Sequence, residues 1–273
     1  MKVYIQTDIE GVAGMTFFDR RTDSYENFHH RQRMRRLLTG EVNAAVKGAF
    51  AAGAKEVVVN DNHGCCYSIL FEELDPRCEI LHGRANTQPF WLPEIDQGFD
   101  VMLLVGMHAM GGTLGASLPH SKWTLNDGEI FLSEASMAAA LAGCHGIRAI
   151  FISGDQYITR EVGKKVPGII TAVVKKSLGP YFARSRIPAA SQKLIFEGVK
   201  KAMREAKKIK PLKLKPPFRL NLLESKNHAP PFKKILKKDV CGNDLVKVFQ
   251  QAVNAFPWNN FGQKYVDDFV FPA

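Results

Sequence analysis

The sequence predicts an α/β protein: a three-layer sandwich with a mostly parallel sheet, plus a smaller C-terminal α+β subdomain. Over the first 155 residues, short apolar segments alternate with helical ones, as in sheets whose strands are joined by helices. Several apolar segments lack a polar face, which is typical of parallel strands covered on both sides. After residue 155 the alternation loosens. We therefore expect a main domain over residues 1–186 and a subdomain over residues 187–273.

Four strands are predicted in the first part of the main domain. Residues 3–7 alternate apolar and polar side chains, which is the period of a strand. The segments EVVVN at 56–60, VMLLV at 101–105 and AIFIS at 149–153 are largely apolar runs, as buried strands are. Two further strands are expected at 169–174 and 218–223.

The predicted helices follow apolar side chains that recur with a period of 3.6 residues. The clearest helix runs from about 31 to 52, where Leu38, Val42 and Ala45 recur at helical spacing and Gly53 supplies a stop. The segment 209–218 carries three prolines and is expected to be extended. Further helices are expected at 132–144, 157–166, 189–208 and 243–255.

Composition excludes several classes of protein. A hydrophobic fraction of 45% and a charged fraction of 23% are typical of a globular chain, not of a disordered one. No apolar run reaches the ~18 residues of a membrane-spanning helix. Acidic Asp8 and Glu10 stand where a secretion signal would need apolar residues. The five cysteines are irregularly spaced and predict neither a disulfide framework nor a zinc knuckle. We expect a cytoplasmic protein with no membrane partner.

The chain is basic, with a net charge of +10. Basic residues gather at 31–36, where four of the six are arginine, and lysines are frequent in the C-terminal third. One interpretation is a nucleic-acid-binding protein. No helix-turn-helix, RNP or zinc-finger signature accompanies the charge, so a solvated helix face is the preferred interpretation. Nucleic acid is not an expected partner.

Acidic and histidine side chains follow the predicted strands at the point where each strand ends. In open α/β sheets, functional residues gather just beyond the carboxyl ends of the strands. Asp8 and Glu10 follow the first strand, His63 follows EVVVN, and His108 follows VMLLV. Glu134 stands in the first turn of the helix before AIFIS. Asp8 and Glu10 are two residues apart, so on extended backbone their side chains point to the same side.

These residue types in combination suit a metal site. Two carboxylates forced together repel each other, and a cation between them removes the conflict. Carboxylates with imidazoles are ligands for Zn²⁺, with Mn²⁺ or Co²⁺ as alternatives. Five ligands exceed the three protein ligands of a single catalytic zinc, and fit two metals ~3.5–4 Å apart with one bridging carboxylate. Taken singly, each residue has a simpler explanation, such as a turn-forming Asp8 or hydrogen-bonded loop histidines.

The chain resembles the zinc-dependent D-aminopeptidases, peptidase family M55. The resemblance rests on D-I-E-G from Asp8, V-N-D-N-H ending at His63 and G-M-H-A around His108. P-H-S around His120 and S-E-A around Glu134 follow. The similar segments keep the family's order from residue 1 to about 175 and are specific in combination. The segment after Gly14 departs from the family pattern, as does Ser133 in the position before the glutamate.

The resemblance implies a site and an activity. It implies two zinc ions per subunit, with Asp8 bridging them and Glu10, His63, His108 and Glu134 as the other metal ligands. It implies that His120 is the catalytic histidine, acting as general base, general acid, oxyanion donor or nucleophile. The implied substrates are short peptides with an N-terminal D-amino acid, of D-Ala type. The implied assembly is a homo-oligomer, a decamer of stacked rings.

The expected function is therefore a metallo-aminopeptidase that hydrolyses peptides with a metal-activated water. The same ligand set would also suit a dinuclear metal phosphoesterase or another metallohydrolase. A phosphate site would favour a glycine-rich strand-to-helix loop with a nearby Lys or Arg, and no GxxxxGK occurs in the sequence. Asp61 is a candidate to orient His63, with a turn-forming role as the alternative.

Overall fold

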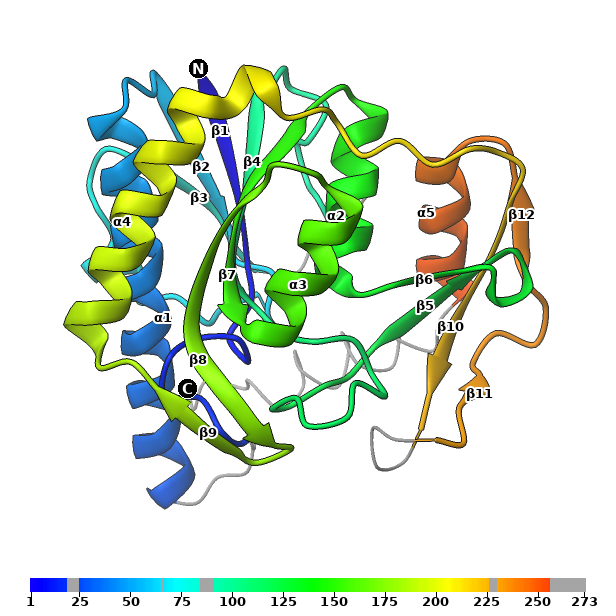
Figure 1. Ribbon diagram of the computed structural model, residues 1–273, viewed down its shortest axis with the longest axis horizontal. Coiled ribbons are helices and arrows are strands. Elements are labelled where there is room, and N and C mark those ends of the chain that lie inside the picture. The colour runs from blue at the N-terminus through cyan, green and yellow to red at the C-terminus, as the bar shows by residue number, and fades with distance from the viewer. Residues whose placement is uncertain (19–24, 65, 84–90, 226–229, 256–273) are drawn as a thin grey trace, which may run out of the picture.

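The main sheet of the computed structural model is parallel except at one edge (Figure 1). The structure describes residues 1–18, 25–64, 66–83, 91–225 and 230–255. The strand order is β3-β2-β1-β4-β7-β8-β9, and only β9 runs antiparallel to its neighbour. The predicted fold class is confirmed. The strands are β1 (Lys2–Thr7), β2 (Glu56–Asn60), β3 (Glu79–Leu81), β4 (Val101–Met107), β7 (Arg148–Asp155), β8 (Ile170–Gly179) and β9 (Phe182–Ser185).

Helices cover both faces of this sheet, as Figure 1 shows. Helices α1 (Tyr25–Ala51) and α4 (Pro188–Glu205) pack together and cover one face, where they contact β2, β4, β7 and β8. Helices α2 (Glu134–Cys144) and α3 (Gln156–Lys165) cover the other. Gly48 allows the first pair to approach closely, because a Cβ there would lie 2.8 Å from the Phe196 carbonyl oxygen. Nearly every side chain of α2 is buried, which its alanine-rich sequence permits.

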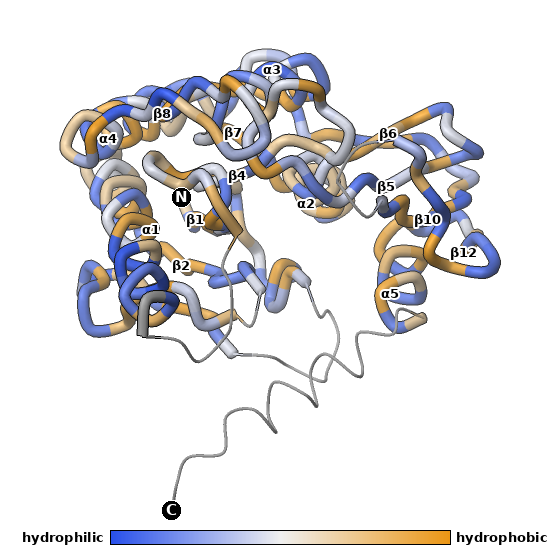
Figure 2. The backbone as a smooth tube through the Cα atoms, turned by 90° about the horizontal axis from the view of Figure 1, so that it is seen from below, coloured by the Kyte–Doolittle hydropathy of each residue, from blue (hydrophilic) through white to orange (hydrophobic). Residues whose placement is uncertain are grey.

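A second, antiparallel sheet lies to one side of the main sheet, as Figure 2 shows. Two of its strands come from within the main domain and three from the C-terminal region. Helix α5 (Leu245–Ala255) covers it, with the Phe249 ring 5.1 Å from that of Trp123. Short 3-10 helices occur at Phe71–Glu73, Asn126–Gly128 and Ala206–Lys208. The strands are β5 (Lys122–Leu125), β6 (Ile130–Leu132), β10 (Phe218–Glu224), β11 (Lys233–Lys234) and β12 (Val240–Gly242).

The division at residue 187 stays a prediction. Helix α4 follows it directly and packs on α1 and β8 of the main sandwich. The elements gathered apart from the main sheet are the second sheet and α5. Residues 226–229 and 256–273 of the predicted subdomain lie outside the described ranges. Among the residues that the structure describes, no helix combines the length and the apolar character needed to span a bilayer.

Helix α1 carries a buried acid, Glu41, and its ionisation should make stability depend on pH. Burial raises the pKa of Glu41 from 4.5 to about 7. The unfolded carboxyl therefore ionises at lower pH than the folded one, so its stabilising contribution is complete below pH 4.5 and is lost by about pH 7. The loss amounts to about 3 kcal/mol for this group.

We expect the Glu41→Gln variant to lack this loss. Urea unfolding at pH 5 and pH 8 measures it: the wild type should lose more stability over this interval than the variant does. Groups that do not interact with Glu41 titrate equally in both proteins, so the difference between them reports this carboxyl together with its effect on Lys175. Parallel decreases in the two proteins would contradict the expectation.

Candidate metal centre

Three adjacent strands bring the predicted ligands together. β1 lies between β2 and β4 in the sheet, so the carboxyl ends of all three meet at one edge. Asp8 and Glu10 follow β1, His63 follows β2, and His108 follows β4 directly. Glu134 begins α2, where Ser133 caps the helix by accepting a hydrogen bond from the Ser136 amide. The structure thus brings all five predicted ligands to one place.

The predicted extended backbone from Asp8 to Glu10 is wrong. The chain leaves β1 at Asp8 and turns through Glu10 and Gly11. This turn needs glycine, because a Cβ at Gly11 would lie 2.0 Å from the Met107 carbonyl oxygen. The Gly11 amide instead donates to the Gly106 carbonyl at 2.8 Å. Close contact between the loop after β1 and the last residues of β4, rather than strand alternation, therefore shapes the segment that carries the two carboxylates.

Asp8, Glu10 and His63 form the first donor group. The Nδ1 atom of His63 lies 3.1 Å from Asp8 Oδ1 and 3.2 Å from Glu10 Oε2. The three donor atoms lie within 4.8 Å of one another. The side chains are largely withdrawn from solvent, with exposed fractions of 8%, 4% and 10% respectively.

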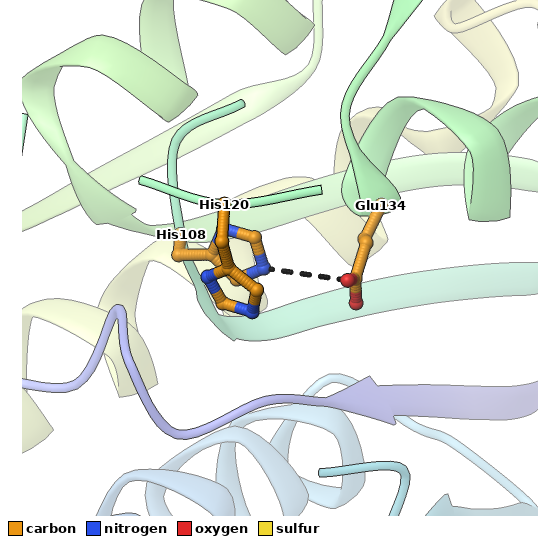
Figure 3. A group of neighbouring side chains, drawn as sticks. All are labelled: His108, His120 and Glu134. Carbon is orange, nitrogen blue, oxygen red and sulfur yellow. Dashed lines mark ion pairs between the residues drawn. The ribbon is translucent and has the colours of Figure 1, made fainter. Parts of the chain in front are cut away.

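His108, His120 and Glu134 form the second donor group, drawn in Figure 3. His108 Nε2 lies 3.7 Å from Glu134 Oε1. The rings of His108 and His120 stack with their centroids 3.7 Å apart. The structure therefore places His120 among the potential ligands, whereas the resemblance implies a catalytic role for it. Glu134 also interacts with the side chain of Ser121.

Asp8 connects the two donor groups. Its Oδ1 atom faces His63, and its Oδ2 atom lies 3.3 Å from His108 Nε2. Within the described ranges, four buried donor atoms at the centre lack a hydrogen-bond partner: Asp8 Oδ2, Glu10 Oε2, His63 Nε2 and His108 Nε2. Buried polar atoms normally find partners, so such a group of orphaned oxygens and nitrogens points to a bound ion as their partner. A pair of divalent cations fits this donor set.

Protonation compensates the charges within the centre. Burial and the adjacent Glu10 carboxylate raise the pKa of Asp8 to about 7. Burial lowers the pKa of His108, but Asp8 and Glu134 outweigh it and raise that pKa to about 10. Burial likewise opposes ionisation of Glu134, but His108 outweighs it and holds the pKa of Glu134 at about 2. Metal binding to such a centre would release the protons of the imidazoles.

His120 differs from the other two imidazoles. Its Nδ1 atom donates to the Leu118 carbonyl at 3.0 Å, which leaves the acceptor lone pair on Nε2. Burial and the neighbouring His108 lower the pKa of His120 to about 4, so the ring is neutral near pH 7. Leu118 and Ser121 flank it with φ angles of 53° and 49°, a conformation that side chains rarely adopt. The loop therefore holds this ring in a strained but defined position.

A hydrogen bond fixes the orientation of the His108 ring as well. Its Nδ1 atom donates to the Ala109 carbonyl at 2.8 Å, so Nε2, which faces Asp8, is the nitrogen available to a metal. Such a second hydrogen bond is usual for histidines that bind metals. Asp61, the predicted orienting residue, accepts from the amides of Ser68 and Ile69 at 2.6 and 2.9 Å. These bonds close the loop that carries His63, and the role of Asp61 in orienting His63 stays a prediction.

Sequence reasoning missed a residue that supports Glu134. Glu161 of α3 accepts from the hydroxyls of Ser133 and Ser136 at 3.0 and 2.9 Å. Its charge thus lies at the N-terminus of α2, where an anion is favourable. This contact could hardly be predicted from the sequence, because Glu161 is separated from Ser133 by 28 residues and a strand.

Imidazoles and carboxylates at the carboxyl edge of an α/β sheet are the arrangement of a metal-dependent hydrolase. A sequence profile of peptidase family M55, described as D-aminopeptidase, matches residues 1–237. The D-aminopeptidase of Bacillus subtilis (strain 168) is 30% identical over 222 residues, which are 78% of this chain and 77% of that protein. The chain belongs to the D-aminopeptidase family, as the motifs predicted.

A solved structure has the same fold. It is the Zn-dependent D-aminopeptidase DppA from Bacillus subtilis, described as a self-compartmentalizing protease. The two chains superpose with a TM-score of 0.78 over 100% of each, at 22% sequence identity. Family membership makes the chain an aminopeptidase, a peptide hydrolase. Family membership therefore favours the aminopeptidase prediction over the phosphoesterase and nucleic-acid-binding alternatives.

Proposed function

We propose that the protein is a dinuclear zinc aminopeptidase that removes an N-terminal D-amino acid, of D-Ala type, from short peptides. The observation that carries this proposal is the pair of donor groups with Asp8 between them. The name of the Bacillus relative supports the substrate class, and the zinc dependence of the solved relative supports the metal. A cytoplasmic location remains a prediction from the sequence.

In this proposal Asp8 would be shared by the two metals. Glu10 and His63 would hold one of them, and His108 and Glu134 would hold the other. Bound zinc supplies a Lewis acid for the scissile carbonyl and lowers the pKa of water to ~7. The grouping of the donor atoms supports this division of the ligands.

His120 is the acid–base residue in this proposal. Its neutral ring presents a lone pair on Nε2, while the hydrogen bond from Nδ1 to Leu118 fixes the ring. Nε2 therefore accepts the proton of the attacking water and then delivers it to the leaving amine.

Peptide hydrolysis before and after chelation tests the proposed function. The purified protein should cleave D-Ala-D-Ala faster than L-Ala-L-Ala, lose this activity on chelation and regain it with Zn²⁺. Cleavage of both dipeptides at equal rates would contradict the proposed preference for D-amino acids. Undiminished cleavage after complete metal removal would contradict a role for the metal in hydrolysis.

We further propose that the chain forms a homo-oligomer, a decamer as the family resemblance implies, through the hairpin of β8 and β9. Large apolar side chains are rarely left to solvent in a cluster. This hairpin and its exit carry four of them, with exposed fractions of 50% to 71%: Leu178, Tyr181, Phe182 and Ile187. The self-compartmentalizing character of the solved relative supports a second copy as the partner.

A charge at the hairpin should break the assembly. We expect Phe182→Asp, which replaces a ring that is 65% exposed, to lower the native mass measured by light scattering. Phe71 is 55% exposed and lies outside the hairpin, so Phe71→Asp serves as the matched control. An unchanged mass in the Phe182 variant, or equal dissociation in both, would exclude the hairpin as the interface.

A further inference from the structure

A buried lysine lies beneath the loop that carries Asp8 and Glu10. Lys175 is in β8, and its side chain is 2% exposed. Its Nζ atom donates to the Glu10 carbonyl and, at 2.7 Å, to the Met15 carbonyl. Lysine is among the residues least often buried, because its charge must leave water. The two carbonyls are backbone groups of the same loop, at its start and its end.

The surroundings compensate the charge of Lys175 from a distance. Among the described residues it makes no direct ion pair, but the carboxylates of Asp155, Glu10, Glu41 and Asp8 act on it together. Two other elements hold the same loop. Glu41 of α1 accepts from the Ala13 amide at 3.1 Å, and Ser185 of β9 accepts from the Gly14 amide at 3.0 Å.

We propose that Lys175 is the positioning residue of the metal-binding loop, residues 8–15. Its ammonium ties the two ends of the turn together, and this contact keeps the Asp8 and Glu10 carboxylates side by side before any cation is bound. The proposal rests on the proposed metal site, because the loop matters to function only if its carboxylates bind a metal. Lys175 touches neither substrate nor metal and acts through the backbone of Glu10.

Two measurements on the full-length Lys175→Met variant test this role. Methionine keeps the length of the side chain but removes the charge and the donors. In the metal-free protein, amide hydrogen exchange of residues 9–15 should become faster, while the amides of β1 and β4 keep their protection. Zinc affinity, measured by competition with a chelator, should fall ~10–100-fold, as for the loss of other residues that orient metal ligands.

A neighbouring variant separates positioning from general stability. Val174 is fully buried beside Lys175 on the same strand, so Val174→Ala destabilises the fold while leaving the ammonium contacts with the Glu10 and Met15 carbonyls in place. It should leave loop exchange and zinc affinity unchanged. Equal losses in both variants, or unchanged exchange and affinity in Lys175→Met, would overturn the proposal.

Two further controls keep the outcome decisive. If Lys175→Met fails to fold, Lys175→Gln retains an N–H donor on a shorter chain and should show a smaller change of the same kind; unchanged loop exchange in it would overturn the proposal. If the wild type binds no zinc, the proposed function fails, and the exchange measurement still tests whether Lys175 holds the loop.

Discussion

Replacing Asp8 by asparagine should abolish most of the aminopeptidase activity without unfolding the protein. In the proposed centre Asp8 bridges both metals, so its loss removes the shared ligand and lowers the metal content below two per chain. Losing about 4 kcal/mol of transition-state stabilisation corresponds to a decrease of about 10³-fold in kcat/KM. Kinetics with D-Ala-D-Ala and metal analysis of the same sample measure both effects.

The stability of Asp8→Asn provides an internal control. Burial and Glu10 raise the pKa of Asp8 to about 7, so its charged form is unfavourable in the metal-free fold. The asparagine variant should therefore unfold at a temperature equal to or above that of the metal-free wild type. Asp75→Asn is the matched variant, because Asp75 is a buried acid that pairs with Arg77 and belongs to neither donor group. It should keep its zinc and its activity; loss of zinc in both variants would contradict a specific role for Asp8.

Replacing His120 by glutamine should lower kcat by ~10²–10⁴-fold, the range for loss of a general acid–base group. The variant should retain two zinc ions and a nearly unchanged KM, because the proposed ligands remain in place. Stopped assays over a range of substrate concentrations separate kcat from KM. Metal analysis of the same variant then shows whether His120 is an acid–base residue or a metal ligand.

Two outcomes would change the assignment of His120. Loss of one zinc ion per chain would make it a ligand, in keeping with its place in the second donor group. Undiminished kcat would remove it from the mechanism altogether. His145→Gln is the control, because His145 is exposed at the end of α2 and outside both donor groups.

The central strands were predictable because burial on both faces leaves a direct mark on the sequence. β2 has the predicted bounds, and β4 extends two residues beyond its predicted end. The short strands were missed: β3 has three residues, and β6 has three. Strands of this length lack a full period of alternation, and they form only because a neighbouring strand offers hydrogen-bonding groups.

The ligands were predictable for a similar reason. They follow strands directly, and the parallel sheet gathers such positions at one edge. Lys175 and Glu161 left no comparable signal. Lys175 is 165 residues from the carbonyl it binds, and a lysine within a strand is normally taken for a solvent-facing residue. Only the register of β8 against β7 brings it beneath the loop.

The metal content of the purified protein tests the central claim most directly. The chain should be reconstituted with Zn²⁺, freed of excess metal by gel filtration and analysed by plasma mass spectrometry. We predict two zinc ions per chain for the wild type and fewer for Asp8→Asn. A wild type that retains no zinc, or a variant that retains two, would contradict the bridged dinuclear centre.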